Sequence, residues 1–386
     1  MPLALAVLVP PNNAVQWFRA GEEIFPAMLD AIAAATESVR LETYIYTNGE
    51  IGRQFLDALV AAQLRGVKVS VLVDAMGSWL LPADFFTPLL AAGGEAKFFN
   101  PLRLWRFGVR NHRKLLVCDA RVTFVGGFNI ADEYNGDGVT HGWCDLGAGL
   151  ENLKLAAELA KSFDEMFALA DFENKPLLRL RVFKPRRVRM KPPSGELLLN
   201  HPGRGASPVE KALLHDLRHA QDVAIISAYF LPTWRLRRAL MQVARRGGRA
   251  RLILAGKSDV LVSQLAGRDL YRRLLRAGVE IYEYEPQILH AKLMLLNGAA
   301  YVGSANLDIR SLKLNYELVL RFEDKTTVAG AQKLFDDNLK LCKRIERAAW
   351  RKTDTFWPRL NQSWAHFLLA RLDPWLAMKH YGQLKD

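Results

Sequence analysis

Residues 112–129 read HRKLLVCDARVTFVGGFN, and residues 290–306 read HAKLMLLNGAAYVGSAN. Each stretch begins with His-x-Lys, continues as an apolar run, and ends with Gly-Gly-x-Asn or Gly-Ser-x-Asn. The spacing from His to Asn is 17 residues in the first copy and 16 in the second, which predicts a turn that is one residue shorter. A lone His-x-Lys is a weak signal, but two copies with matching Gly and Asn indicate an internal repeat.

The similarity extends upstream of both motifs. LLAAGGE at 89–95 is echoed by LLRAGVE at 274–280, and AAQLRGV at 61–67 resembles VARRGG at 243–248. Short β-branched runs bounded by Gly and Pro alternate with longer periodic segments, which is typical of α/β units. Each half is therefore predicted to contain, in this order, a strand, a helix, a strand, a helix and a strand. The expected strands are 39–46, 68–73, 223–228 and 249–255, and the expected helices are about 51–64 and 235–244.

The motifs themselves are predicted to lie on pairs of strands, 114–118 with 122–125 and 292–296 with 300–302. Side chains alternate between the two sides of a strand. The His and Lys of each motif should therefore point to the same side, and the residue between them should point away.

A length of 386 residues suits two domains that each bury a core, and 50% hydrophobic residues exclude a globally disordered chain. We expect an N-terminal domain at 1–175, a basic linker at 176–208, a C-terminal domain at 209–344, and a Trp-rich, basic, amphipathic segment at 345–386. The three cysteines lack metal-ligand spacing and give no disulfide framework, which favours a reducing compartment.

Two His-Lys pairs predict an anion site that contains two imidazoles, His112 and His290. One neutral imidazole can attack phosphorus while the other, protonated, donates to the leaving oxygen. Lys114 and Lys292 would hold phosphoryl oxygens and offset the charge that grows in the transition state. The expected phosphate-binding residues are Asn129, Asn306, Ser304 and Gly127. The sequence has no convincing metal-ligand cluster, and we expect neither a metal nor a cofactor.

A catalytic imidazole needs a carboxylate behind it to fix its orientation. Glu317 lies eleven residues beyond Asn306, and alignment of the repeats makes Asp145 its counterpart. Glu133 is a competing candidate in the first half.

Asp119 and Asn297 complete the two His-x-Lys-x4-Asp/Asn patterns and are candidate catalytic residues. Both fall where one strand turns into the next, and Asp or Asn is favoured there for turn formation alone. Turn formation is the favoured interpretation for both.

These residues resemble the phospholipase D superfamily, whose signature is two His-x-Lys-x4-Asp copies. RNHRK at 110–114, GGFNIADEY at 126–134, YFLP at 229–232 and NLDIRS at 306–311 look like the bacterial cardiolipin synthase branch, in its shorter, cardiolipin synthase B-like form without N-terminal transmembrane helices. The resemblance covers roughly residues 21–323. It implies an α/β protein with two tandem phospholipase D-like α/β/α sandwich domains, related by an internal repeat, with the active site at their interface.

The resemblance also implies phosphatidyl transfer through a phosphohistidine, with cardiolipin and glycerol formed from two phosphatidylglycerol molecules. It assigns His112 as the nucleophile and His290 as acid and then base, with the reverse assignment as the alternative. Glu317 would then support His112, and Asp145 would support His290. Asn297 stands where the family has Asp, and since Asn keeps the shape and a turn hydrogen bond, we expect an active enzyme.

Two other functions compete with phosphatidyl transfer. A phospholipase D-type phosphodiesterase would use the same chemistry to hydrolyse phospholipid or nucleic acid. A binding protein that keeps the scaffold without catalysis is the third reading, and the intact His, Lys and Asn residues of both halves argue against it.

The net charge of +13 and a pI near 9.7 call for an anionic partner. The densest basic run, residues 179–191, suits anionic lipid headgroups, and a solvated loop is the alternative. We expect anionic phospholipids and a membrane surface as partners rather than nucleic acid, and the sequence assigns no oligomeric state. The predicted location is peripheral, on the cytoplasmic face of the bacterial inner membrane.

The two ends of the chain bear on membrane contact. Residues 1–9 are apolar but too short to span a bilayer, which favours an edge strand or surface segment. Trp350, Trp357 and Trp364 are seven residues apart, so they lie along one side of a helix among basic residues. Such a segment suits the membrane interface, or equally a helix packed back onto the core.

Overall fold

The computed structural model describes residues 14–100, 108–170, 186–189, 195–203, 205–353 and 356–373. The apolar segment 1–9, the basic residues 179–184 and Trp375 lie outside these ranges. The chain separates into two compact units. Unit 1 contains the described residues from 14 to 170, apart from Gly108 and Val109, which belong with the later residues in unit 2.

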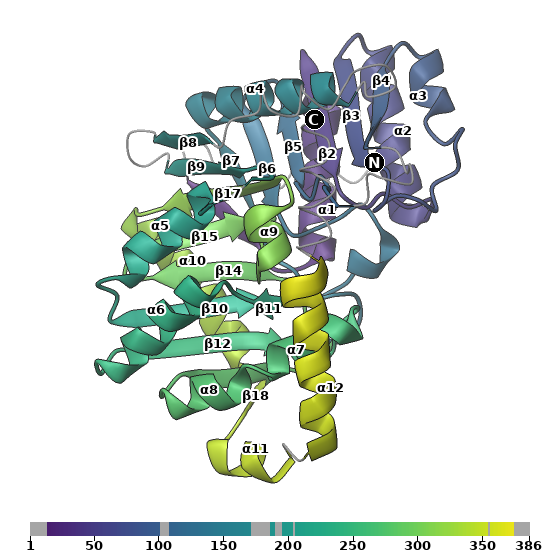
Figure 1. The fold of residues 1–386 in the computed structure, drawn as a ribbon. Helices are drawn as coiled ribbons and strands as arrows, with labels where there is room; N and C mark the ends of the chain where they lie inside the picture. Colours follow the sequence, from purple (N-terminus) through teal and green to yellow (C-terminus); the bar gives the residue numbers. More distant parts are fainter. Residues whose placement is uncertain are drawn as a thin grey trace, which may run out of the picture. The chain divides into compact units, whose positions relative to one another are not determined.

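Unit 1 is built on a seven-stranded sheet with the order β1-β7-β6-β5-β2-β3-β4. The strands are β1 (Val15–Phe18), β2 (Ser38–Thr43), β3 (Lys68–Asp74), β4 (Glu95–Phe99), β5 (Leu115–Cys118), β6 (Val122–Gly126) and β7 (Gly147–Glu151). Its helices are α1 (Gly21–Ala34), α2 (Glu50–Leu64), α3 (Thr87–Ala91) and α4 (Leu153–Leu169). The helices α1 and α2 pack together on one side of the sheet, and α4 contacts β2, β4, β5 and β6 (Figure 1).

Unit 2 is built on a nine-stranded sheet with the order β18-β13-β12-β10-β14-β15-β17-β9-β8. The strands are β8 (Arg186–Arg189), β9 (Glu196–Asn200), β10 (Asp222–Ser227), β12 (Arg249–Ala255), β13 (Glu280–Tyr284), β14 (Lys292–Leu296), β15 (Ala299–Gly303), β17 (Glu317–Phe322) and β18 (Cys342–Arg344). A separate pair joins β11 (Phe230–Leu231) to β16 (Leu307–Asp308) in parallel.

The helices of unit 2 again form layers on its sheet (Figure 1). They are α5 (Pro208–Leu217), α6 (Trp234–Arg245), α7 (Leu261–Arg268), α8 (Tyr271–Arg276), α9 (Ile309–Lys313), α10 (Lys325–Lys340), α11 (Arg347–Thr353) and α12 (Phe356–Phe367). The adjacent helices α5 and α6 contact β9 and β12, and α10 contacts β10, β13, β14 and β15. Each unit has its own buried apolar cluster.

The strand orders confirm the predicted repeat. β7-β6-β5-β2-β3-β4 in unit 1 corresponds to β17-β15-β14-β10-β12-β13 in unit 2, with the same parallel and antiparallel pairings. The expected strands and helices that flank the motifs lie within one to three residues of the observed ones. The predicted α/β class with two sandwich domains related by an internal repeat is therefore correct.

The second half of the predicted linker is structured rather than a connector. β9 pairs antiparallel with β17, as β1 pairs with β7, so Glu196–Asn200 is the first strand of unit 2 and the counterpart of β1. Arg187 and Arg189 on β8 both form ion pairs with Glu196, which ties part of the basic run to this edge. Pairing with β17, whose residues lie more than 100 positions further along the chain, overrides the basic composition that suggested a loop.

Candidate active site

The first motif lies at the carboxyl edge of the parallel strands of unit 1. β5 runs antiparallel to β2 and pairs Leu115 with Glu42, so the residues that precede β5 lie beside the end of β2. His112 and Lys114 are both buried, and the Lys114 ammonium donates to the His112 carbonyl oxygen at 2.9 Å. The Tyr44 ring lies 4.8 Å from the His112 ring, centroid to centroid. The lysine charge is therefore held next to the histidine.

The second motif repeats this arrangement in unit 2. Lys292 lies at the start of β14 opposite Ser227 of β10, and His290 precedes it. The Lys292 ammonium contacts Nδ1 of His290 at 3.0 Å and also reaches its carbonyl oxygen. The Tyr229 ring lies edge-on to the His290 ring at 6.3 Å. Each predicted His-Lys pair is thus together on one side of its strand.

Arg113, between His112 and Lys114, points to the other side, as the alternation of side chains predicts. Its guanidinium forms an ion pair with Glu42 at 3.1 Å, and Glu42 also accepts a hydrogen bond from the Asn111 side chain at 2.7 Å. All three residues are buried. Burial raises the pKa of Glu42 above its ordinary value, against the opposing effect of the Arg113 charge.

A second buried ion pair holds the same segment. Arg110 donates to Asp74 at 2.7 Å, and Asp74 accepts from the backbone nitrogen of Asn111 at 2.9 Å. Burial raises the pKa of Asp74, against the Arg110 charge. The sequence analysis missed both carboxylates, although charges at the ends of the apolar strands β2 and β3 were a signal for them. In unit 2 the position of Arg113 is taken by Ala291, so only the first motif has this network.

Asp119 and Asn297 form turns at the other end of the motif strands. Asp119 and Ala120 have φ angles of +54° and +45°, while Asn297 and Gly298 have +49° and +89°, the values of turns that join two antiparallel strands. The first loop contains three residues and the second contains two, because Cys118 pairs with Val122 while Leu296 pairs with Ala299. The turn is therefore one residue shorter in the second copy, as predicted.

The Asp119 carboxylate accepts hydrogen bonds from backbone groups of unit 1. Its two oxygens accept hydrogen bonds from the backbone nitrogens of Thr36, Glu37 and Ser38 at 2.8–2.9 Å. Partial burial raises the pKa of Asp119, but these backbone donors outweigh it and hold the pKa below its ordinary value. Asp119 lies five positions beyond Lys114 along an extended strand, which places it about 16 Å away at ~3.3 Å per residue. This geometry favours turn formation over catalysis for Asp119 and for its exposed counterpart Asn297.

The two motif asparagines join neighbouring segments of their own units. Asn129 accepts from the Ile45 backbone nitrogen at 3.0 Å and donates to the Tyr134 hydroxyl at 2.6 Å. Asn306 accepts from the Tyr229 backbone nitrogen at 3.5 Å. Both are buried, and both fasten the chain that follows β2 or β10. Their amide oxygens serve this role.

Gly127 and Ser304 occupy equivalent positions beside the predicted orienting carboxylates. The Gly127 nitrogen donates to the Leu146 carbonyl oxygen at 3.0 Å, and the Ser304 nitrogen donates to that of Leu318 at 2.9 Å. Asp145 and Glu317, the residues before these two leucines, are both fully buried. The Ser304 hydroxyl donates to the Glu317 carboxylate. These contacts support the repeat alignment of Asp145 with Glu317.

Glu133 differs from Asp145 in exposure. It lies on the 3-10 turn Asp132–Tyr134, where its side chain is exposed to solvent. A carboxylate that orients an imidazole needs a fixed, desolvated position. The structure therefore favours Asp145 over Glu133 as the counterpart of Glu317.

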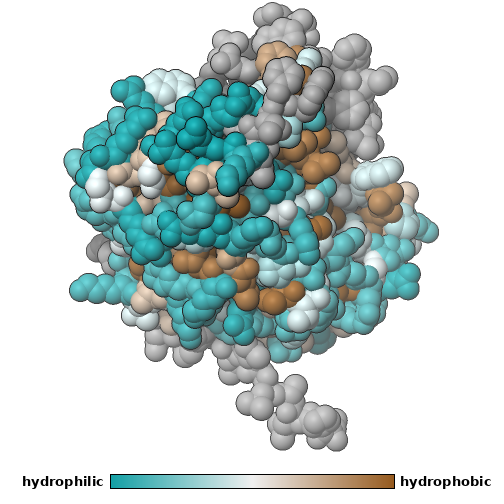
Figure 2. Space-filling view, turned by 90° about the horizontal axis from the view of Figure 1, so that it is seen from below, coloured by the Kyte–Doolittle hydropathy of each residue, from teal (hydrophilic) through white to brown (hydrophobic). Residues whose placement is uncertain are grey.

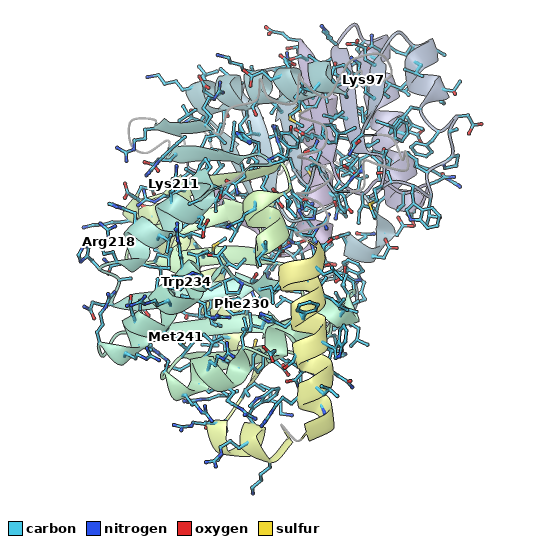
Figure 3. All side chains as sticks on the ribbon, viewed as in Figure 1. Lys97, Lys211, Arg218, Phe230, Trp234 and Met241 are labelled. Atoms are coloured by element: carbon cyan, nitrogen blue, oxygen red, sulfur yellow. The ribbon has the colours of Figure 1, made fainter. Side chains whose placement is uncertain are left out.

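A hollow of about 560 Å³ opens in unit 2 beyond the segments that carry Tyr229 and Asn306. It is lined by Leu231 of β11, by Trp234 at the start of α6 (labelled in Figure 3), and by Ile309 of α9. Three cations, Arg235, Arg237 and Lys313, face one carboxylate, Glu210, across its walls. The lining therefore contains more cations than carboxylates.

Each half of the repeat supplies the same three groups: an imidazole, an ammonium beside it, and a buried carboxylate. The carboxylate lies just before β7 or at the start of β17, two strands along the sheet from the motif strand. An ammonium group stabilises charge on phosphoryl oxygens, and an imidazole acts as nucleophile or as acid and base. Among the residues that the structure describes, no three His, Cys, Asp or Glu side chains are grouped to hold a metal ion.

Comparisons with known proteins agree with this arrangement. The family model described as "Cardiolipin synthase, PLD-like domain" matches residues 28–167 and 213–339. Cardiolipin synthase B of Escherichia coli K12 is 34% identical over 328 residues, which cover 81% of this chain and 77% of that protein. Cardiolipin synthase B of Salmonella typhimurium is 32% identical over 383 residues, 92% of this chain and 88% of the relative.

A solved structure shows the same fold at low sequence identity. The crystal structure of phosphatidylserine synthase from Haemophilus influenzae superposes with a TM-score of 0.75 at 13% identity, covering 94% of this chain and 95% of that one. The two matched segments of the family model fall one in each unit and together include both His-x-Lys motifs. The chain is therefore a member of the phospholipase D-like family of cardiolipin synthases.

Proposed function

We propose that this protein transfers a phosphatidyl group between phospholipids and makes cardiolipin and glycerol from two molecules of phosphatidylglycerol. The observation that carries the proposal is the repeated motif, in which a lysine ammonium is held against a buried histidine at the same strand position in each unit. Relatives named cardiolipin synthase, which this chain matches over most of its length, support this substrate class.

In the proposed first step, His112 attacks the phosphorus of one phosphatidylglycerol. A nitrogen–phosphorus bond forms while the bond from phosphorus to the glycerol headgroup oxygen breaks. His290, protonated, gives its proton to that oxygen, and glycerol leaves. In the second step His290 removes a proton from a hydroxyl of the second phosphatidylglycerol. That oxygen then displaces His112 from phosphorus, which yields cardiolipin.

The remaining residues of the site hold and stabilise these groups. Lys114 and Lys292 would offset the charge on the phosphoryl oxygens in both transition states. Asp145 and Glu317 would orient the imidazoles, and Ser304 fixes one carboxylate oxygen of Glu317. The Asn129 and Asn306 amides keep the segments after β2 and β10 in place, and their nitrogens would donate to phosphate.

The proposal is tested by incubating the purified protein with phosphatidylglycerol that carries one label in its headgroup and another in its acyl chains. Cardiolipin with one released glycerol per cardiolipin is the expected result. Phosphatidic acid in place of cardiolipin would instead support hydrolysis, and the absence of turnover would support a binding protein. His112→Ala and His290→Ala should each reduce turnover about a thousandfold or more, because each removes a group that bonds to or protonates the reacting atoms.

The assignment of His112 as the nucleophile and His290 as the acid is tested separately. Trapping of the enzyme with a label in the phosphatidyl group, under an alkaline quench that preserves the acid-labile phosphohistidine, should fail for His112→Ala, since no nucleophile remains. His290→Ala should still trap label slowly when the glycerol is replaced by a headgroup that leaves without a proton, such as nitrophenol. The reverse pattern would exchange the two roles.

We also propose a peripheral association with the cytoplasmic face of a bacterial membrane. No helix within the described ranges is both long and apolar enough to cross a bilayer. α12 packs against α7 with Ala365 buried, while Leu360, Trp364 and Phe367 are 41%, 58% and 51% exposed. These three side chains recur at intervals of four and three residues and thus form an apolar stripe on the free side of the helix. The net charge of +13 would favour an anionic lipid surface.

A further inference from the structure

Two loops, one in each unit, expose apolar side chains at equivalent positions. In unit 1 the loop follows β3, and in unit 2 it follows β12. The parallel registers Ser38–Lys68 and Asp222–Arg249 align the two strands residue by residue. The first loop residues confirm the alignment, because Ala75 and Gly256 each donate a backbone hydrogen bond at 3.0 Å to the end of the next strand.

This alignment places Trp79 and Leu80 opposite Val260 and Leu261. Trp79 and Leu80 are 67% and 71% exposed, and Val260 and Leu261 are 42% and 63% exposed. A single exposed leucine is ordinary in a folded protein. The same two positions are exposed and apolar in both halves of the repeat, although the residues themselves differ. Figure 2 shows one face of the molecule, which is mostly hydrophilic with several apolar patches.

Hydrogen bonds hold the base of each loop next to a motif histidine. In unit 1 the Ser78 hydroxyl accepts from the Tyr46 nitrogen at 2.9 Å and donates to the Tyr44 carbonyl oxygen at 3.2 Å. In unit 2 the Tyr229 hydroxyl donates to Asp259 at 2.6 Å. Tyr44 and Tyr229 are the residues whose rings contact His112 and His290. Each loop therefore has a fixed base beside a reactive group and an apolar tip in solvent.

We propose that the loop at 76–80 and the segment 257–262, a loop that runs into the first turn of α7, insert their apolar tips into the surface of an anionic phospholipid bilayer. This inference deepens the proposed function, since it says how a lipid held in a bilayer reaches each motif. Indole and aliphatic side chains partition into the headgroup and upper acyl region of a bilayer. Charge complementarity favours this occupant over a protein partner, because the chain carries a net charge of +13 and Lys257 is exposed in the second loop.

The fixed base of each loop gives the insertion a consequence for catalysis. A tip held at the level of the lipid headgroups keeps the edge of the sheet that bears His112 or His290 at the depth of the scissile phosphate. The loops should therefore matter for substrate held in a bilayer and much less for monomeric substrate in water.

The test uses the full chain with Trp79→Ser/Leu80→Ser, with Val260→Ser/Leu261→Ser, and with all four changes. Leu64→Ser is the matched control, since Leu64 is 72% exposed but ends α2, at the opposite edge of the unit 1 sheet. The measurements are sedimentation with phosphatidylglycerol vesicles, and turnover of vesicle substrate relative to short-chain phosphatidylglycerol below its micelle concentration. Circular dichroism checks that each variant is folded.

Each double variant should weaken vesicle binding about tenfold and lower the ratio of vesicle to monomer turnover about tenfold, or ~1.4 kcal/mol. Trp79→Phe/Leu80→Ile should restore both values. The Leu64→Ser control should match the wild type. Unchanged binding and an unchanged ratio in folded variants would overturn the proposal, as would equal losses on vesicle and monomeric substrate. If the wild type turns over neither substrate, the proposed function fails, while sedimentation still tests the loops.

Discussion

A Cβ atom on Gly127 would lie 2.0 Å from Oδ1 of Asp145. Asp145 is fully buried, and its carboxylate accepts from the Leu146 nitrogen at 2.7 Å, so it has little space in which to move. The counterpart of Gly127 is Ser304, whose hydroxyl donates to the longer Glu317 side chain. The glycine of the first motif thus makes room for a carboxylate, and the serine of the second binds one.

Gly127→Ala should therefore displace the Asp145 carboxylate. We expect turnover to fall about a hundredfold, the scale of losing one well-placed polar group in an active site. Stability should fall by about 1–3 kcal/mol, the usual range for overpacking. Gly203→Ala is the control, because a Cβ there meets His201 at an ordinary 3.6 Å. Turnover close to that of the wild type in Gly127→Ala would remove Asp145 from the proposed site.

Asn297→Asp should change turnover less than a few-fold. Asn297 is exposed at a positive φ of 49° in a two-residue turn, where Asp and Asn are both tolerated. Its backbone nitrogen donates to Asp222, a bond that either residue can make. Steady-state turnover of phosphatidylglycerol measures the effect. A wild-type protein without activity that gains it on this substitution would show that the charge is essential.

Glu42→Gln should destabilise unit 1 by about 3–5 kcal/mol, because it removes one charge of the buried ion pair between Glu42 and Arg113. Denaturant unfolding followed by circular dichroism measures this loss. Adding Arg113→Met to Glu42→Gln should recover part of it, since the second charge of the pair is then removed as well. Additive losses in the double variant would show that the ion pair does not carry the effect.

Asp119→Asn should make stability less dependent on pH at the acid end. The pKa of Asp119 is below its ordinary value of 3.8 in the folded protein, so its carboxylate stabilises the fold above that pH. The contribution is lost as the pH falls through the folded-state pKa. Melting temperatures of wild type and Asp119→Asn should therefore differ at about pH 6 and converge towards about pH 3. A constant difference across that range would argue against the role of these hydrogen bonds.

Trp364→Ser/Phe367→Ser should lower sedimentation with anionic vesicles without unfolding unit 2. Both side chains are more than half exposed, while Ala365 on the other side of α12 packs into the core. Trp350 differs, because its ring packs against Tyr271 at 4.9 Å, and truncation after Arg344 would remove that contact together with the whole helix. The double variant is therefore the cleaner measurement. Sedimentation equal to that of the wild type would show that α12 packs against unit 2 without contributing to membrane binding.

Several features of the protein followed from local sequence patterns. The repeated His-x-Lys with its Gly and Asn predicted the tandem fold, the motif strands and the shorter second turn. Alternation along a strand also predicted that His112 and Lys114 share a side and that Arg113 points away. These are properties of neighbouring residues, and the geometry of an extended chain with two residues per repeat is enough to derive them.

Other features depend on residues that are far apart in the chain. Glu42 meets Arg113, and Thr36 donates to Asp119 across 83 positions in sequence. Contacts between residues distant in sequence also explain why part of the expected linker forms β9. They likewise explain why Asp145 is buried while Glu133 is exposed. Burial and partner choice depend on which strands pair and which helices cover them. A side chain's type states what it can bond to, and only the packed structure decides which partner reaches it.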